Sequence, residues 1–136
     1  MVPLPEGFLN ALAGRDEMLV SSRTEARTGT VPMSFVVAPP GVVYLLTAAF
    51  SRKAQRWESD PWVRLTVPGT DVAVEAAARP VSADELDTAT EALILDGFTA
   101  AGATTPEALR QMLDVGTHVL LRVEGRDPSA AGEPVP

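Results

Sequence analysis

Residues 42–69 read VVYLLTAAFSRKAQRWESDPWVRLTVPG and form the most informative segment of the chain. The segment opens with the apolar run Val42–Thr47, which is typical of a buried strand. Residues 51–60 lack β-branched side chains and favour a short helix that stops before a proline. Alternation of apolar and polar side chains then returns over Trp62–Val67, and a Pro-Gly pair suited to a type II turn follows. The segment therefore predicts a strand, a short helix, a second strand and a tight turn.

The strand signal continues on both sides of this segment. Residues 30–38 alternate in the manner of a strand, although Pro32 cannot donate a hydrogen bond and belongs at a sheet edge or a bulge. Together with the two strands above, the pattern predicts six strands. The four additional strands are Glu17–Thr24, Thr30–Ala38, Val72–Pro80 and Thr117–Glu124. Tight turns favour an antiparallel sheet, and about six strands close most economically into a barrel.

Helices are expected at the periphery of this barrel. Residues 5–14 predict a short N-terminal helix that ends at a glycine. The sequence SADE over Ser82–Glu85 is a capping box, and it predicts a helix that reaches about Phe98. Thr104 or Thr105 starts a shorter helix. The side chains expected to face inward are Leu86, Ala89, Leu93, Ile94 and Phe98 in the longer helix, and Leu109, Met112 and Leu113 in the shorter one.

Length, composition and charge limit the possible classes of function. A chain of 136 residues fits one domain, predicted over residues 1–126 with a disordered tail over 127–136. No apolar run approaches the roughly 20 residues that span a bilayer, and we expect a cytoplasmic protein without membrane contact. The net charge of −7 argues against nucleic acid as a partner. Cysteine is absent, which excludes disulfides and thiolate chemistry.

Side chains for direct catalysis are scarce, and we predict neither a catalytic residue nor a metal site. His118 is the single histidine, and no nucleophile-elbow motif accompanies it. Asp84, Glu85 and Asp87 fall in the first turn of a predicted helix, where negative charge stabilises the helix dipole. The sequence contains no glycine-rich phosphate loop and no dinucleotide-binding fingerprint. An enzyme of this composition would therefore take its reactive group from a cofactor.

Residues 47–53, TAAFSRK, are the one segment with the chemistry of a binding site. The Thr47 hydroxyl and the triplet Ser51, Arg52 and Lys53 follow directly on the buried strand. Arginine can bind a phosphate through two parallel hydrogen bonds, lysine adds a compact charge, and serine donates a further bond. A local cationic site in an acidic chain suits a small anion better than a polyanion. The alternative is a solvated run of charges.

The same segment resembles the flavin-phosphate-binding region of the pyridoxamine-phosphate oxidase family and its split-barrel relatives. The shared features are an apolar strand ending in Thr47, a short step to Ser-Arg-Lys-Ala at 51–54, a short helix, and the pattern Asp-Pro-x-Val-x-Leu over 60–65. A weaker likeness extends over residues 18–82. The resemblance implies a mainly β fold, a six-stranded antiparallel split β-barrel with peripheral helices, that binds a flavin-type cofactor.

The resemblance also implies roles for individual residues. Arg52 and Lys53 would hold the cofactor phosphate, assisted by hydrogen bonds from Ser51 and Thr47. The backbone of the second strand would lie against the edge of the flavin ring, and the residues concerned are Thr30, Val31, Pro32 and Met33. Members of the family are usually homodimers with the cofactor at the interface. The expected partners are therefore a second copy of the chain and a small-molecule substrate.

The likeness departs from the oxidases at three places. Residues 30–37 carry neither the arginine nor the lysine that the family's second strand supplies to the phosphate. A flavin-contacting glutamine is replaced near Asp71, and His118 and Arg122 do not match the residues that bind the pyridoxal substrate. These departures argue against vitamin B6 oxidation. They leave two cofactors open, FMN and 8-hydroxy-5-deazaflavin, because both carry a phosphate at the same end of a tricyclic ring.

The leading hypothesis is an FMN- or deazaflavin-dependent oxidoreductase that transfers a hydride to or from a small apolar substrate. Two alternatives stay open. The first is a non-catalytic split barrel that binds flavin or haem, with His118 as an axial ligand of the haem iron. The second is a barrel kept only for contacts between subunits, which would bind no cofactor.

Overall fold

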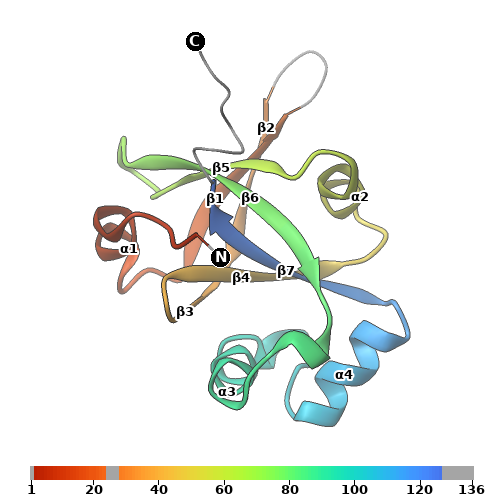
Figure 1. The fold of residues 1–136 in the computed structure, drawn as a ribbon. Coiled ribbons are helices and arrows are strands. Elements are labelled where there is room, and N and C mark those ends of the chain that lie inside the picture. The colour runs from red at the N-terminus through yellow and green to blue at the C-terminus, as the bar shows by residue number, and fades with distance from the viewer. Residues whose placement is uncertain (1, 24–27, 127–136) are drawn as a thin grey trace.

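The computed structural model describes residues 2–23 and 28–126 as a curled β-sheet surrounded by helices (Figure 1). The tail predicted over 127–136 lies outside the described residues. None of the described helices is long and apolar enough to cross a membrane. The strands are β1 (Glu17–Arg23), β2 (Thr28–Ser34), β3 (Val36–Ala38), β4 (Val42–Ala48), β5 (Trp62–Thr66), β6 (Ala73–Val81) and β7 (His118–Gly125). The helices are α1 (Glu6–Leu12), α2 (Arg52–Ser59), α3 (Thr88–Gly97) and α4 (Pro106–Asp114), with short 3₁₀ turns η1 (Ala83–Glu85) and η2 (Thr99–Ala101).

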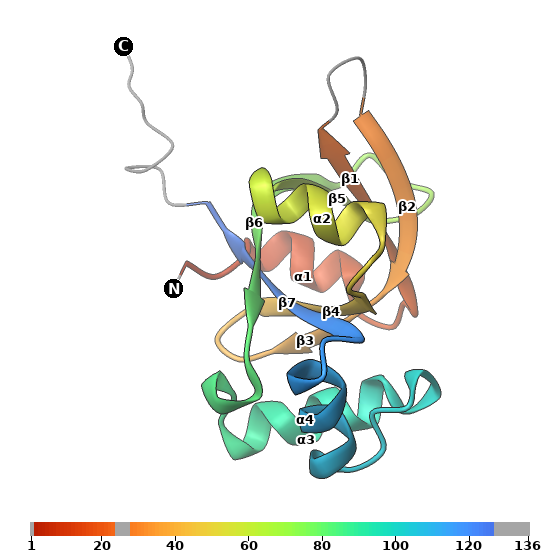
Figure 2. The same cartoon turned by 90° about the vertical axis from the view of Figure 1, so that its right-hand side faces the viewer.

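All the strands belong to one antiparallel sheet with the order β2-β1-β5-β6-β7-β4-β3. β2 and β3 lie at the two ends of this order, yet Phe35 alone separates them in the chain. The sheet must therefore curl until its end strands meet, and Figure 2 shows the long curve of β2 descending toward β3 and β4. This arrangement confirms the mainly β, antiparallel split-barrel fold with peripheral helices. β7, which follows the other described strands in the chain, lies inside the sheet between β6 and β4.

The described residues form seven strands where the sequence predicts six, because residues 30–38 form two strands rather than one. The first part pairs with β1, and the second part pairs with β4, where Val37 lies opposite Val43. β1 and β4 are not neighbours in the sheet, so one straight strand cannot pair with both. The chain therefore changes partner at Phe35. The other five predicted strands correspond closely to β1, β4, β5, β6 and β7.

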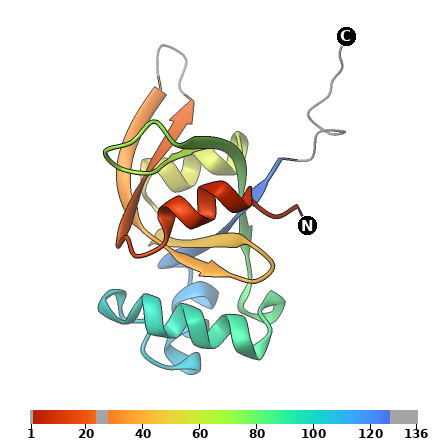
Figure 3. The ribbon, with the colours of Figure 1, turned by 90° about the vertical axis from the view of Figure 1, so that its left-hand side faces the viewer.

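The interior of the barrel is filled by apolar side chains, and two helices close its ends. Figures 1 and 3 show α1 at one end, with α2 at the other. Phe8 and Leu12 from α1 are buried in this interior, and Trp57 from α2 is only 1 % exposed. The strands contribute alternate residues, as the period of two requires. These residues include Met18, Val20, Met33, Val43, Leu45, Val63, Leu65, Ala76, Ala78, Leu121 and Val123.

A second apolar cluster lies outside the barrel, between the sheet and the helices α3 and α4. Both helices lie beneath β3, β4 and β7 in Figure 1. Tyr44 and Leu120 come from the outer faces of β4 and β7, and Ile94 and Phe98 come from the α3 region. β4 is therefore apolar on both faces. This burial explains why Val42–Thr47 is a nearly continuous apolar run in the sequence.

Close contact between α3 and β3 depends on Gly97. A Cβ atom at this position would overlap the side chain of Val36, so a larger residue would push the helix and the strand apart. Ile94, one turn earlier on α3, is fully buried in the same cluster. The glycine therefore determines how deeply α3 packs against the sheet.

The helix predicted from Ser82 begins later than expected. The capping box does form, since the Ser82 N–H donates to the Glu85 carboxylate at 2.7 Å, but it opens only the short turn η1. Leu86 is extended and ends that turn. Asp87 then caps α3, where its Oδ1 accepts a hydrogen bond from the Thr90 N–H at 2.7 Å. Two successive caps thus replace the single helix start that the sequence predicts.

The later start turns a different face of α3 toward the sheet. Thr90, Ile94 and Phe98 are buried. Leu93 is 39 % exposed, and Ala89 is exposed as well, so the prediction that both face inward is wrong. A helix that continued from Ser82 without a break would have a different rotation about its axis, and this is why the inward positions differ.

α4 begins at a predicted cap. Thr105, rather than Thr104, accepts a hydrogen bond from the Ala108 N–H at 3.0 Å, and Pro106 follows at the first helical position. Leu109 is fully buried in the outer cluster, which confirms its predicted inward orientation. The cap fixes where α4 begins, and Leu109 packs the helix against the sheet beside α3.

Candidate functional site

The segment between β4 and α2 forms a capped helix start. Ser51 is the N-cap of α2, and its Oγ accepts a hydrogen bond from the Ala54 N–H at 3.1 Å. Arg52 and Lys53 are the first two residues of the helix, and their side chains lie outside the described part of the structure. The first turn of a helix leaves backbone N–H groups without intrahelical partners at the positive end of the helix dipole. The backbone alone therefore offers donors to an anion here.

Thr47 connects this helix start to the sheet. Its Oγ1 lies 3.5 Å from the Ser51 Oγ, at the limit of a hydrogen bond between two hydroxyls. Thr47 is 7 % exposed and lies on β4 opposite Val119 of β7. Because the Ser51 hydroxyl already accepts from the Ala54 N–H, it keeps its own proton for Thr47 or for a ligand.

Thr47 also lines an open pocket of about 340 Å³ between β2, β4 and the turn after α3. The lining residues are Glu17, Pro32, Met33, Ser34, Leu46, Thr47, Gly97, Phe98, Ala100 and Ala101. Six of the ten lining residues have apolar side chains, and the polar side chains are the Glu17 carboxylate and the hydroxyls of Ser34 and Thr47. The surface that lines the pocket is slightly more polar than apolar. Apolar side chains with a few polar groups are typical of small-molecule sites.

β2 brings half of the predicted ring-binding segment to this pocket. Pro32 and Met33 line it. Thr30 and Val31 lie further along β2 and do not line it. The Thr30 hydroxyl is 2.9 Å from that of Ser21 on β1, and Val31 is 38 % exposed. These two residues therefore belong to a neighbouring surface rather than to the pocket wall.

The structure thus brings Pro32, Met33 and Thr47 into one pocket and joins Ser51 to that pocket through the Thr47 hydroxyl. Three strand residues and one helix cap, separated by up to nineteen positions in the sequence, become neighbours because β2 and β4 meet where the sheet curls on itself. Four of the predicted residues, Pro32, Met33, Thr47 and Ser51, therefore lie in one continuous region between the helix start of α2 and the pocket.

The far wall of the pocket comes from residues that sequence analysis does not assign to a site. Gly97, Phe98, Ala100 and Ala101, at the end of α3 and in η2, line this wall. The signal available in the sequence is the run of small residues TAAGA over 99–103, which indicates a tight turn as readily as a pocket wall. Because these residues are remote from β2 and β4 in the chain, no local pattern connects them to the site.

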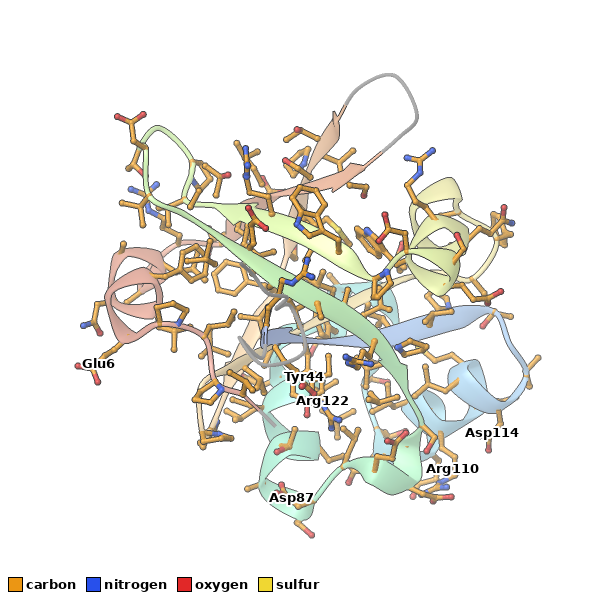
Figure 4. The ribbon with its side chains drawn as sticks, turned by 45° about the horizontal axis from the view of Figure 1, so that its top comes forward. Glu6, Tyr44, Asp87, Arg110, Asp114 and Arg122 are labelled. Carbon is orange, nitrogen blue, oxygen red and sulfur yellow. The ribbon has the colours of Figure 1, made fainter. Side chains whose placement is uncertain are left out.

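Arg122 lies outside this pocket, on the outer face of the sheet. Its Nε donates to the Glu124 Oε2 at 2.8 Å, and the two side chains are 19 % and 13 % exposed. Burial opposes the charge of Arg122, but hydrogen bonds to Glu124 and Tyr44 outweigh this effect and raise its pKa above the ordinary value. Figure 4 shows Tyr44 and Arg122 side by side, as their pairing across β4 and β7 requires. Arg122 therefore binds its own neighbours.

No family model matches this sequence, and no curated protein sequence matches it. Solved structures do match. A pyridoxamine 5'-phosphate oxidase candidate from Listeria innocua has a TM-score of 0.62 and 12 % identity, over 90 % of this chain and 93 % of its own. The heme storage protein HutZ from Vibrio cholerae has a TM-score of 0.60 and 16 % identity, over 93 % and 92 %. A FAD-binding protein from Mesorhizobium loti has a TM-score of 0.55 and 12 % identity, over 91 % of each chain. At these identities the likeness establishes the fold.

Proposed function

We propose that this chain, which has the split-barrel fold of the pyridoxamine 5'-phosphate oxidase-like proteins, binds FMN or a deazaflavin and transfers a hydride between that cofactor and a small apolar substrate. One observation carries the proposal. The Thr47 hydroxyl belongs both to the wall of the pocket and to the hydrogen-bonded start of α2. A helix start suited to a phosphate and a pocket suited to a ring system are therefore direct neighbours.

At the phosphate end, Arg52 and Lys53 would make the charged contacts with the cofactor phosphate. Ser51 and Thr47 would add hydrogen bonds to it. The start of α2 supports this assignment, because the first turn of a helix directs backbone N–H groups and the positive end of the helix dipole toward an anion. Hydrogen bonds to a charged group contribute about 1.5 to 3 kcal/mol each. Three such contacts sum to about 4.5 to 9 kcal/mol, and the upper end of this range corresponds to micromolar affinity before the rest of the cofactor contributes.

At the ring end, the pocket of about 340 Å³ is near the lower limit of small-molecule sites, which measure roughly 300 to 1,000 Å³. This volume suits a ring system or a small substrate and is too small for a whole flavin nucleotide. The edge of the cofactor ring would therefore lie along the backbone of residues 30–33. The linker to the phosphate would run past Thr47 toward Ser51.

When bound, the cofactor supplies the hydride chemistry, so the chain needs no acid–base pair of its own. The protein's residues would bind and orient the cofactor and the substrate. Met33, Leu46 and Phe98 line the pocket with apolar side chains, which disfavour water next to the reacting atoms. Pro32 and Met33 lie on a strand paired with β1, so their positions are well defined for holding a substrate in line with the ring.

We further propose that two copies of the chain form a homodimer with the cofactor at the interface. Phe50 precedes the helix start and is 79 % exposed, and Val115 is 67 % exposed. The Ala49 N–H donates to the Thr117 carbonyl at 3.0 Å, so the loops that carry these two side chains lie side by side. Large exposed apolar side chains that gather in one region are typical of contact surfaces. Light scattering should give twice the monomer mass, and a monomeric wild type would contradict the homodimer.

A second candidate function is haem binding, favoured by the likeness to a heme storage protein of the same fold. His118 begins β7 opposite Ala48 and is half-buried, and its Nδ1 lies 3.0 Å from the Thr117 Oγ1. This contact occupies Nδ1 and leaves Nε2 for an iron ligand. Added haem should then give a Soret band that His118→Ala loses. An identical spectrum in the variant would remove this candidate.

The test of the cofactor site is a fluorescence titration with FMN and with the deazaflavin separately. Wild type should bind one of them, and Arg52→Ala/Lys53→Ala should bind it roughly a hundredfold more weakly because two charge-assisted contacts are lost. The control is Arg79→Ala/Arg126→Ala, which removes the same charge from two exposed arginines outside α2. The control should stay within about threefold of wild type, since exposed charges are screened.

Two outcomes would contradict the proposed function. Absence of binding to either cofactor would favour a barrel that is kept only for subunit contacts. Equal losses in the site variant and in the control would mean that general attraction, rather than a defined phosphate site, holds the cofactor.

A further inference from the structure

We propose that the exposed face of α3 is a docking surface for a positively charged amphipathic helix of another protein. Ala89, Ala92, Leu93 and Asp96 together make up this α3 surface. None of these residues lines the pocket or belongs to the start of α2. Docking at the α3 surface would therefore not depend on a bound cofactor.

α3 carries apolar side chains on its exposed face, whereas a helix at the surface of a protein usually has charged and polar side chains there. Thr90 and Ile94 are the buried residues of the helix. Ala89 and Ala92 are exposed, and Leu93 is 39 % exposed. Ala92 and Leu93 follow Ala89 by three and four positions, so the three side chains share one face of the helix. Apolar side chains that gather on one exposed face are typical of contact surfaces.

The position of α3 leaves room for a second helix beside it. Figure 3 shows α3, in blue-green, at the outside of the helical layer, with no other part of the described chain in front of it. From the opposite side, Figure 2 shows α4 in front of α3. The short side chains of Ala89 and Ala92 would let a partner helix approach closely, with Leu93 packed between its side chains. The ten residues of α3 extend over about 15 Å, or nearly three helical turns.

The segment that carries α3 also holds most of the net negative charge of the chain. Residues 82–116 contain seven acidic side chains and one arginine, which gives a net charge of −6, against −7 for all 136 residues. The arginine, Arg110, already donates to the Asp84 carboxylate at 2.7 Å. Asp96 lies in the α3 surface itself, and Glu91 is half-buried on the same helix. A concentration of one sign of charge attracts partners of the opposite sign.

This charge selects among the partners that an apolar helix face can accept. A second copy of the chain would bring two segments of net charge −6 together, and like charges that face each other disfavour contact. Nucleic acids and anionic lipid surfaces are repelled for the same reason. A helix with an apolar stripe flanked by lysines or arginines satisfies both features of the α3 surface. It would cover the alanines and Leu93 and bring positive charge to Asp96.

The test uses three synthetic peptides of about 18 residues, a length at which a helix can form. The first peptide has leucines in one helical stripe and lysines around it. The second has the same composition in an order without a stripe, and the third has glutamate in place of each lysine. Each labelled peptide is titrated with the full chain, and fluorescence anisotropy measures binding. The first should bind at least about tenfold more tightly than the second, because only the first can bury its leucines against α3. The third should not bind.

An apolar variant and its matched control locate the contact. Leu93→Ser should weaken binding of the first peptide about tenfold, because an apolar contact in the α3 surface is lost. The control, Val72→Ser, changes an apolar side chain of nearly equal exposure, 38 %, between β5 and β6, and it should bind like wild type. In ¹⁵N-labelled wild type, the first peptide should shift the backbone amide signals of residues 88–97 and leave those of residues 73–81 in place.

A charge variant tests the electrostatic part of the recognition. Glu91→Gln/Asp96→Asn should weaken binding of the first peptide about fivefold, because each exposed ion pair contributes a factor of about two. Glu6→Gln/Asp16→Asn removes the same charge from two exposed acids outside residues 82–116 and should stay within about twofold of wild type. Cooperative urea unfolding of every variant establishes that it folds.

Equal affinity of wild type for the first two peptides would overturn the proposal, because charge alone would then hold them. Unchanged binding in Leu93→Ser, or amide shifts that leave residues 88–97 in place, would overturn it as well. A dimer of the chain that Leu93→Ser abolishes and Val72→Ser keeps would identify a second copy, rather than a basic helix, as the occupant of the α3 surface.

Discussion

The two apolar clusters of this molecule lie on opposite faces of the same strands and are enclosed in different ways. Inside the barrel, neighbouring strands supply alternate residues such as Leu45 and Leu121, and helices only close the ends. Outside it, the opposite faces of β4 and β7 supply Tyr44 and Leu120, and α3 and α4 cover them. The inner cluster is enclosed by a curled sheet, whereas the outer one depends on a helical segment that packs from one side.

The pocket lies where these two clusters meet. Met33 belongs to the inner cluster and Phe98 to the outer one, and both line the pocket. A site at such a boundary can have one wall on the rigid sheet and another on a helical layer whose packing is easier to change. This difference implies that β2 and β4 would fix the position of a bound ligand, while the volume of the pocket would depend on how closely α3 packs against the sheet.

Matched leucine truncations would test this contrast with the largest expected effect. Leu45 and Leu109 are both fully buried, one in each cluster. Leu45→Ala is expected to lower the free energy of unfolding by about 4 kcal/mol and Leu109→Ala by about 2 kcal/mol, because α4 can move into the space and the closed barrel cannot. Urea unfolding measures both. Faster amide exchange confined to α4 should accompany Leu109→Ala alone, and equal costs would mean that both clusters behave as one.

A smaller effect on stability is expected at the contact between α3 and β3. Gly97→Ala should lower the free energy of unfolding by about 1 to 2 kcal/mol, because the new methyl group overlaps Val36 by more than the gain in helix propensity offsets. Val36→Ala removes the overlapping side chain, so the double variant should recover most of the loss caused by the alanine at position 97. A double-mutant cycle in urea measures this coupling. Additive effects would mean that the close approach is not what the glycine provides.

The smallest effect is expected from pH at the start of α3. The hydrogen bond from the Thr90 N–H, followed by that from its side chain, holds the pKa of Asp87 below its ordinary value. Because the folded-state pKa is the lower one, this stabilisation is present at neutral pH and is lost as the pH falls through the folded-state pKa.

Asp87→Asn keeps an acceptor at the cap and removes the titration. The difference in urea midpoint between wild type and this variant should therefore shrink from pH 7 to pH 3. Asp96→Asn, which alters an exposed acid on the same helix, serves as the control. A difference that stays constant over this range would contradict the assigned role of the Asp87 charge.

The parts of the fold that could be predicted are those in which a local pattern decides the outcome. Strands β4 and β5 and helix α2 lie within residues 42–69, and each has its own periodicity and its own stop signal. The division at Phe35 has no local signal, because it arises from pairing with two strands that lie apart in the sheet. The start of α3 could not be predicted either, since Ser82 and Asp87 are both good caps. The sequence does not show that the first cap opens only a short turn and the second opens the helix.

The candidate site follows the same rule. Thr47 and Ser51 are four residues apart, so one strand end and one helix cap were enough to suggest their proximity. Pro32 and Met33 could be associated with them through the family resemblance alone. Glu17 and Ala101 could not be associated with the site, because they reach the pocket only through the curl of the sheet and the packing of α3 against it. The described structure therefore adds the wall formed by β1 and the turn after α3, while the sequence already indicates the end of the candidate site at the start of α2.

The position of β7 between β6 and β4 has a consequence for synthesis of the protein. β7 joins the group β2-β1-β5-β6 to the pair β4-β3, and it follows all the other described strands in the chain. Until residues 118–125 emerge, the nascent chain can form only two separate sheets, each with an unpaired edge next to the missing strand. Those edges can pair with other chains, so the barrel cannot close and stays vulnerable to aggregation until β7 has been synthesised.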